Sequence, residues 1–142
     1  MKVSLDELRT FFARDFPQST VTVEAIGPEP GRARVRQEIG HPHLRPGGTV
    51  SGPVMMAVAD SASYAAVLTA IGIVPLAVTT SMTMNFLRRP SSRAAIVGEA
   101  AMLKLGKRLA VMEVKIYSED EDESEPVAHA VATYSLPDQK NV

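Results

Sequence analysis

Residues 45–60, RPGGTVSGPVMMAVAD, decide the fold of this chain. They pass from a loop rich in proline and glycine into an apolar run that continues to about Ala70. Gly52 and Pro53 are typical of a helix start, because a proline in the first turn lacks an N–H that would have no partner there anyway. The residues that follow are small and apolar on nearly every side. This pattern predicts a central helix that other parts of the chain surround.

The spacing of apolar residues predicts further elements on both sides of this helix. Ser4 and Glu7 form a capping-box pattern before apolar residues at helical spacing, which predicts an amphipathic helix over about 4–15. Strands are expected at 20–26, 32–39, 76–88, 94–105, 108–117 and 127–136. Residues 40–50 are expected to form a loop. A curved antiparallel sheet around one central helix satisfies this order, so the expected fold class is α+β.

Composition limits the domain count and excludes several classes of protein. The 142 residues suit one domain spanning 1–142, which can bury roughly 70% of the surface that the unfolded chain exposes. Cysteine is absent, which excludes disulfides and cysteine-ligated zinc. The net charge of −1 argues against the broad basic face that nucleic acid requires.

The apolar segment, the N-terminus and the histidines indicate where the protein is located and whether it binds a metal. The apolar region 53–74 is interrupted by Asp60 and by small polar residues, which favours a buried helix over a membrane span. The N-terminus is polar from the start, so we expect a cytoplasmic protein that binds no membrane. His41 and His43 flank Pro42, but a metal site would need further ligands from elsewhere, so no metal and no cofactor are expected.

Asp60 is the one residue that the apolar pattern does not explain. It lies two turns into the central helix, beyond the first turn in which the helix dipole stabilises an anion. Burying an unpaired carboxylate is costly, so its side chain must be hydrogen-bonded, protonated or facing a cleft. A structural interpretation pairs it with Ser63 or Tyr64, one turn further along the helix. The alternative is a carboxylate that takes part in chemistry.

The spacing of the glycines and of this carboxylate resembles the PaaI-like acyl-CoA thioesterases, which have the hotdog fold. Those proteins carry an Asn, a Gly three residues later, then His-Gly-Gly and a helix with a carboxylate. Here Gly48 and Gly52 match the two glycines, and Asp60 follows Gly52 by eight residues. The segments 84–90, MNFLRRP, and 104–108, KLGKR, resemble the family's strand end and hairpin. The resemblance covers about 32–136.

The resemblance implies hydrolysis of an acyl-CoA thioester to the free acid and CoA. The backbone N–H of Gly52 would polarise the thioester carbonyl, since unpaired N–H groups at a helix N-terminus form an oxyanion site. Asp60 would act as nucleophile or as general base toward water, usually across a dimer interface. In some relatives a hydroxyl on the strand after the helix holds the water, and Thr79 stands at about that place, although it could instead contribute to dimer contacts.

Two positions depart from the family pattern and keep other functions open. Arg45 stands in place of the Asn, and Ser51 stands in place of the His. Ser51 can cap the helix or donate a hydrogen bond, but it supplies no imidazole. The alternatives are a non-catalytic module that binds acyl-CoA and a hotdog-type enoyl-CoA hydratase or dehydratase. The second alternative pairs a loop His with a helix carboxylate, and His43 lies further from Asp60 than that pairing usually shows.

Basic residues at strand ends indicate a ligand, and the unpaired edge of the sheet indicates a second copy of the chain. Coenzyme A phosphates could be bound by five basic side chains, or these could be solvated strand ends. The five are Arg88, Arg89, Lys104, Lys107 and Arg108. The long apolar helix and the extended sheet leave more apolar and edge surface than a monomer tolerates, so a homodimer or homotetramer is expected.

Overall fold

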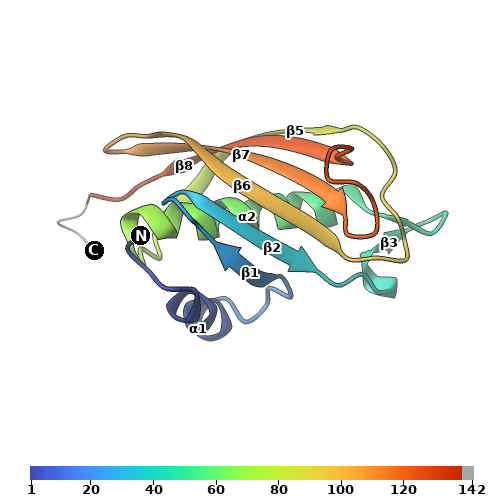
Figure 1. Cartoon of the computed structure of the whole chain (residues 1–142), viewed down its shortest axis with the longest axis horizontal. Coiled ribbons are helices and arrows are strands. Elements are labelled where there is room, and N and C mark those ends of the chain that lie inside the picture. The colour runs from blue at the N-terminus through green and yellow to red at the C-terminus, as the bar shows by residue number, and fades with distance from the viewer. Residues whose placement is uncertain (139–142) are drawn as a thin grey trace.

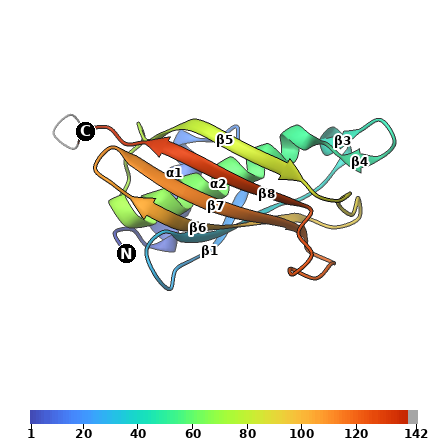
Figure 2. The same ribbon diagram turned by 90° about the horizontal axis from the view of Figure 1, so that it is seen from above.

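A six-stranded antiparallel sheet curves around one long helix, α2 (Gly52–Ile71), as Figures 1 and 2 show. The computed structural model describes residues 1–138. The sheet consists of β1 (Thr22–Ile26), β2 (Arg32–Gln37), β5 (Val78–Phe86), β6 (Ile96–Leu105), β7 (Leu109–Ser118) and β8 (Ala128–Ser135). Its strand order is β1-β2-β6-β7-β8-β5, which leaves β1 and β5 at the two edges. The predicted α+β class and the sheet wrapped around a helix are confirmed.

The helix α1 (Leu5–Asp15) begins at the capping box that the sequence predicts. The Glu7 backbone N–H donates to Ser4 Oγ at 3.1 Å, and the Ser4 N–H donates to Glu7 Oε1 at 3.3 Å. In Figure 1, α1 lies beside β1, on the open side of the curved sheet. Its buried rings contact α2, since the ring centroid of Tyr64 lies 6.1 Å from that of Phe11 and 5.9 Å from that of Phe12.

The predicted loop at 40–50 has more structure than the sequence indicates. It contains a short 3₁₀ turn, His41–His43, followed by a hairpin of β3 (Leu44–Arg45) and β4 (Thr49–Val50). Each of these strands has two residues, which is too short for any periodic pattern to show in the sequence. The hairpin carries Arg45 up to the N-terminus of α2.

Both ends of α2 are fixed by local chemistry. Ser51 caps the helix, one of the two roles considered for it, and accepts a hydrogen bond from the Val54 N–H at 3.4 Å. At the other end, Gly72 has a φ of 92°, a conformation that favours glycine, and its N–H donates to the Leu68 carbonyl at 2.8 Å. The helix α2 is long and apolar enough to cross a membrane, but helices in the core of a globular protein can meet the same criteria of length and hydropathy. More than half of its most apolar stretch is buried inside the fold, which agrees with the predicted central helix.

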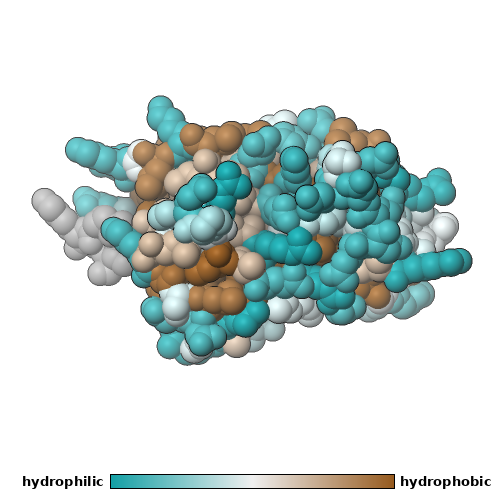
Figure 3. All heavy atoms as spheres, in the orientation of Figure 1, coloured by the Kyte–Doolittle hydropathy of each residue, from teal (hydrophilic) through white to brown (hydrophobic). Residues whose placement is uncertain are grey.

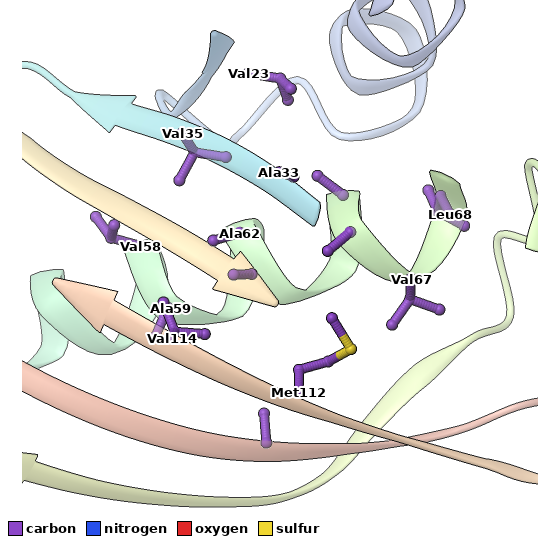
Figure 4. Packing of buried hydrophobic residues seen from close by; sticks show 14 of the residues in the cluster. Val23, Ala33, Val35, Val58, Ala59, Ala62, Val67, Leu68, Met112 and Val114 are labelled. Atoms are coloured by element: carbon purple, nitrogen blue, oxygen red, sulfur yellow. The ribbon is translucent and has the colours of Figure 1, made fainter. Parts of the chain in front are cut away.

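Close packing of α2 against the sheet forms the core, shown in Figure 4. Val58, Ala59 and Ala62 are fully buried under β2, β6 and β7. At Gly98 on β6, an added Cβ would lie 2.8 Å from Val58 Cγ1 and 3.5 Å from the Ala62 Cβ. The absence of a side chain at this position therefore lets the helix approach the sheet.

Charged side chains cover the outer face of the sheet near β1, β2, β6 and β7. Arg34 lies at 2.8 Å from both Glu24 and Glu99, and Arg36 lies 2.6 Å from Glu119. Tyr117, which is buried, donates to Glu99 at 2.8 Å. Burial raises the pKa of Tyr117 to about 12. This network ties the outer sides of neighbouring strands together.

Candidate active site

The Asp60 carboxylate accepts two hydrogen bonds through the same oxygen atom. Thr79 Oγ1 donates to Asp60 Oδ1 at 2.5 Å, and the Tyr134 hydroxyl lies 2.6 Å from Oδ1 and 2.9 Å from the Asp60 backbone carbonyl oxygen. Within residues 1–138, Oδ2 has no hydrogen-bond partner. The carboxylate is therefore held through one oxygen, and the other oxygen is left for a further partner.

The neighbours that the structural interpretation assigns to Asp60 do not contact it by hydrogen bonds. Ser63 Oγ is fully buried and has no partner in the described part of the chain. The Tyr64 hydroxyl donates to the Pro75 carbonyl at 3.1 Å. The interpretation that pairs Asp60 with Ser63 or Tyr64 is therefore wrong. Its partners come from the sheet instead of from its own helix.

A β-bulge brings the two hydroxyls to Asp60. Thr79 of β5 pairs with Tyr134 of β8, but the register shifts between Thr79 and Ser81, so that Ser81 pairs with Thr133. Because of the extra residue, the Thr79 side chain lies on the same face of the sheet as that of Tyr134, which is the face toward α2. The sequence predicts strict alternation, with Thr79 and Ser81 on one polar face of the strand. That prediction is wrong at the bulge.

The Asp60 side chain lines an open cavity of about 280 Å³ between α1, α2 and the edge of the sheet. Its lining residues are Phe11, Asp15, Phe16, Asp60, Tyr64, Pro75, Ala77, Val78, Thr79 and Tyr134. Burial, and then the negative charge of Asp60, raise the pKa of Tyr134 far above its ordinary value. The phenol is therefore protonated at neutral pH and can donate its hydrogen bond to Asp60.

Gly52 lies at the opposite end of β5 from Thr79. A Cβ added to Gly52 would lie 3.3 Å from Cζ of Phe86, the last residue of β5. No acceptor for the Gly52 N–H is present in the described residues, and Pro53 has no N–H to donate. The helix N-terminus therefore presents one free donor at its positive end. It faces a second open cavity of about 360 Å³, also lined by Arg45.

A single chain does not bring Gly52 and Asp60 together. They are eight residues apart on one helix, which corresponds to roughly 12 Å at 1.5 Å per residue. The two residues line different cavities. A carbonyl group polarised by the Gly52 N–H could not reach the carboxylate of the same chain.

The five basic residues form two groups at opposite ends of the sheet. Arg88 and Arg89 line the cavity beside Gly52, and Arg88 pairs with Glu121 at 2.5 Å and with Glu125 at 3.0 Å. Lys107 and Arg108 line a cavity of about 600 Å³ near the C-terminal end of α2. Lys104 precedes them at the end of β6.

Tyr134 is the site residue that sequence reasoning missed. It lies 74 positions after Asp60 in the sequence, on the last strand, and nothing local to it signals a contact with the central helix. In the structure the residue is 1% exposed, and a buried tyrosine hydroxyl needs a partner, which Asp60 provides.

Comparisons with known proteins agree with this architecture. The model of the Thioesterase superfamily matches residues 47–125. A protein from Silicibacter sp. TM1040 that is assigned as a thioesterase is 40% identical, with a TM-score of 0.84 over 94% of this chain and 92% of that chain. A variant of the phenylacetic acid degradation protein PaaI from Thermus thermophilus is 29% identical, with a TM-score of 0.73 over 87% of this chain and 99% of that chain.

More distant structures share the fold. Zebrafish thioesterase superfamily member 2 is 21% identical, with a TM-score of 0.80 over 95% of this chain and 99% of that chain. A search of curated protein sequences gave no match. The family model spans more than half of the sequence, and a relative of 40% identity spans nearly all of it. The chain therefore belongs to the thioesterase superfamily and is a thioester hydrolase with the hotdog fold.

Proposed function

We propose that the protein hydrolyses an acyl-CoA thioester to the free acid and CoA, with Asp60 as the base or nucleophile. The observation that carries the proposal is the Asp60 carboxylate, which is held through Oδ1 by Thr79 and Tyr134 while it lines a cavity. Two donors on one oxygen fix the orientation of the carboxylate and leave Oδ2 as the reacting atom. A residue that was only structural would need no unpaired oxygen beside an open cavity.

The chemistry has two possible forms that use the same atom. As a base, Oδ2 accepts a proton from a water molecule whose oxygen attacks the thioester carbonyl carbon. As a nucleophile, Oδ2 attacks that carbon itself, and water then hydrolyses the resulting anhydride. In both forms the C–S bond breaks and the sulfur of CoA leaves as a thiolate, which takes up a proton.

The Gly52 N–H is the donor that we assign to the thioester carbonyl oxygen. Negative charge develops on this oxygen as the carbonyl carbon is attacked, and an unpaired N–H at the positive end of a helix stabilises it. Ser51 already caps the Val54 N–H, so it supports the helix start instead of acting as a nucleophile. The donor has to come from a second copy, since Gly52 and Asp60 of one chain lie too far apart.

The exposed edge of β5 favours a homodimer that brings these groups together. Asp60 lies near the first residues of β5 through Thr79, and Gly52 lies near the last residue, Phe86. If two β5 edges pair antiparallel, the first residues of one strand lie against the last residues of the other. Gly52 of one copy and Asp60 of the other then face the same substrate. Two such dimers would form a tetramer.

The same pairing would unite the two groups of basic residues. Within one chain Arg88 and Lys107 lie at opposite ends of the sheet, but antiparallel pairing places the Arg88 end of one copy beside the Lys107 end of the other. The phosphates of one CoA could then be bound by both groups.

A panel of acyl-CoA thioesters with detection of the released thiol tests the proposal. The wild-type protein should release CoA from at least one member of the panel and should sediment as a dimer or tetramer at micromolar concentration. A folded protein that releases no thiol from any acyl-CoA would contradict the assigned substrate class. Hydration of an enoyl-CoA without release of thiol would instead favour the hydratase.

A further inference from the structure

We infer that the cavity beside Asp60 takes an acyl group without a negative charge, and that Asp15 at the end of α1 sets this preference. The inference deepens the proposed function and rests on it. Asp15 contacts none of the atoms that react, so its role is in the choice of substrate and not in the chemical step.

The walls of the cavity are aromatic, and its charged groups are all acidic. Four of its lining residues are aromatic: Phe11, Phe16, Tyr64 and Tyr134. The last two rings are stacked, with centroids 6.1 Å apart and planes at 13°. Among the lining residues, the only carboxylates are Asp15 and Asp60, and there is no lysine, arginine or histidine.

The electrostatic field inside this cavity is therefore negative from three sources. Asp15 and Asp60 line the cavity together with Tyr64, and each raises the pKa of Tyr64 after the larger effect of burial. The third source is the C-terminus of α1, since α1 ends at Asp15 and its unpaired carbonyl groups carry partial negative charge.

Within residues 1–138, Asp15 pairs with Arg14, which does not line the cavity. Arg14 donates to both carboxylate oxygens of Asp15 at 3.1 Å, but its side chain is 69% exposed, so it offsets the negative charge of Asp15 only in part. An acyl group that ended in a carboxylate would bring a third negative charge into the cavity lined by Asp15 and Asp60, where no lining residue is a cation that could pair with it. Like charges placed together in a site are a common means of rejecting a wrong ligand.

Two thioesters of equal size separate charge from shape. Glutaryl-CoA ends in a carboxylate, and 5-methylhexanoyl-CoA ends in an isopropyl group with the same number of non-hydrogen atoms. We expect wild-type kcat/KM to favour 5-methylhexanoyl-CoA. The Asp15→Asn variant should reduce this preference about tenfold, which is the effect of removing one charge several ångströms away in a partly screened site.

A matched control is available on the same helix. Asp6 lies in the first turn of α1 and does not line the cavity, so Asp6→Asn removes the same charge without changing the preference. Thermal midpoints of both variants should match the wild type, because both side chains are at the surface.

The outcomes separate this inference from the proposed function. If Asp15→Asn leaves the ratio of the two kcat/KM values unchanged, or if the wild type favours glutaryl-CoA, the charge preference is overturned while acyl-CoA hydrolysis stands. If the folded wild type hydrolyses neither these thioesters nor any other acyl-CoA, the proposed function fails, and this inference fails with it.

Discussion

At the residue scale, the arrangement of donors around Asp60 is the basis for proposing it as the reacting carboxylate. A carboxylate that only satisfies its own burial tends to use both oxygen atoms. Asp60 instead receives Thr79 and Tyr134 on Oδ1 alone. Substitution of Asp60 and substitution of its two donors should therefore affect turnover to different degrees.

The first prediction concerns Asp60→Asn. The turnover number should fall roughly 10²- to 10⁴-fold, the range for loss of a positioned general base. The thermal midpoint should change little, because the amide oxygen of Asn still accepts hydrogen bonds from Thr79 and Tyr134. Turnover and thermal midpoint should be measured on the same preparation. A variant that is less stable by about 1–3 kcal/mol but fully active per folded molecule would show that the residue is structural.

The second prediction concerns the two donors. Thr79→Val and Tyr134→Phe should each lower kcat about tenfold, because a hydrogen bond to a charged group contributes about 1.5–3 kcal/mol. KM should stay near its wild-type value, since neither hydroxyl is assigned to binding. Thr79→Ser keeps the hydroxyl and serves as the control. A Thr79→Val variant with unchanged kcat, or one whose defect Thr79→Ser shares, would remove Thr79 from its positioning role.

The sequence predicted part of this site. Asp60 stood out as a carboxylate in an otherwise apolar helix, and the resemblance to PaaI-like thioesterases added Gly52 at the start of that helix. Thr79 was expected near the site, but the bulge that separates its face from that of Ser81 was not, since an extra residue leaves no mark in the pattern of apolar and polar residues. Tyr134 could not be found, because its contact with Asp60 depends on the closure of the whole sheet.

At the element scale, the fit of α2 into the curved sheet depends on a glycine in β6. The third prediction is that Gly98→Ala lowers the free energy of unfolding by about 1–3 kcal/mol, since the new methyl group overlaps a Val58 methyl group in a close-packed core. Denaturant unfolding measures this change. In the Val58→Ala background the substitution should be less damaging, because the overlapping methyl group is gone. If Gly98→Ala lowered the free energy of unfolding equally in both backgrounds, the overlap with Val58 would not be the cause.

The long elements could be predicted and the short ones could not. The helix α2 and the strands β6, β7 and β8 are long enough for apolar spacing to mark them, and their predicted bounds are close to those observed. The hairpin of β3 and β4 was expected to be loop, because its strands have two residues each. Its turn carries Gly47 and Gly48 at φ of 96° and 76°, a conformation that accounts for the glycines there.

At the scale of the whole molecule, hydrophobic surface is unevenly distributed. In the view of Figure 3, most of it lies toward the end that carries the β6–β7 hairpin, and the opposite end is mostly hydrophilic. Leu103, Leu105 and Leu109 of this hairpin are about half exposed. Exposed apolar surface of this size is typical of proteins that form oligomers, and the homodimer proposed through the β5 edge agrees with it.

The fourth prediction is that the native protein resists ionisation of its tyrosines. The chain has three tyrosines and no tryptophan, and the pKa of Tyr64, Tyr117 and Tyr134 is raised in each case, mainly by burial. A solvent-exposed tyrosine has a pKa of about 10, so at that pH the unfolded chain should show about half of its full tyrosinate absorbance. The native protein should show much less.

The sign of the linked effect on stability follows from the same shifts. Because the unfolded state loses these protons first, the free energy of unfolding should decrease as the pH rises above about 10 and continue to decrease up to the pKa of about 12 of Tyr117. Below about pH 10 the contribution is complete. Urea unfolding at several alkaline pH values measures the decrease, and Tyr117→Phe should make it smaller. A native absorbance titration that matches the unfolded one would contradict the raised pKa of the three tyrosines.

The eight-residue interval between Gly52 and Asp60 has a genetic consequence. In the proposed dimer each site takes the helix start of one copy and the carboxylate of the other. Two null alleles, one encoding Gly52→Pro and the other Asp60→Asn, would therefore complement each other when expressed in the same cell. A mixed dimer has one site with both groups intact, so random assortment of subunits would restore about a quarter of the wild-type activity. Each allele alone would remain null.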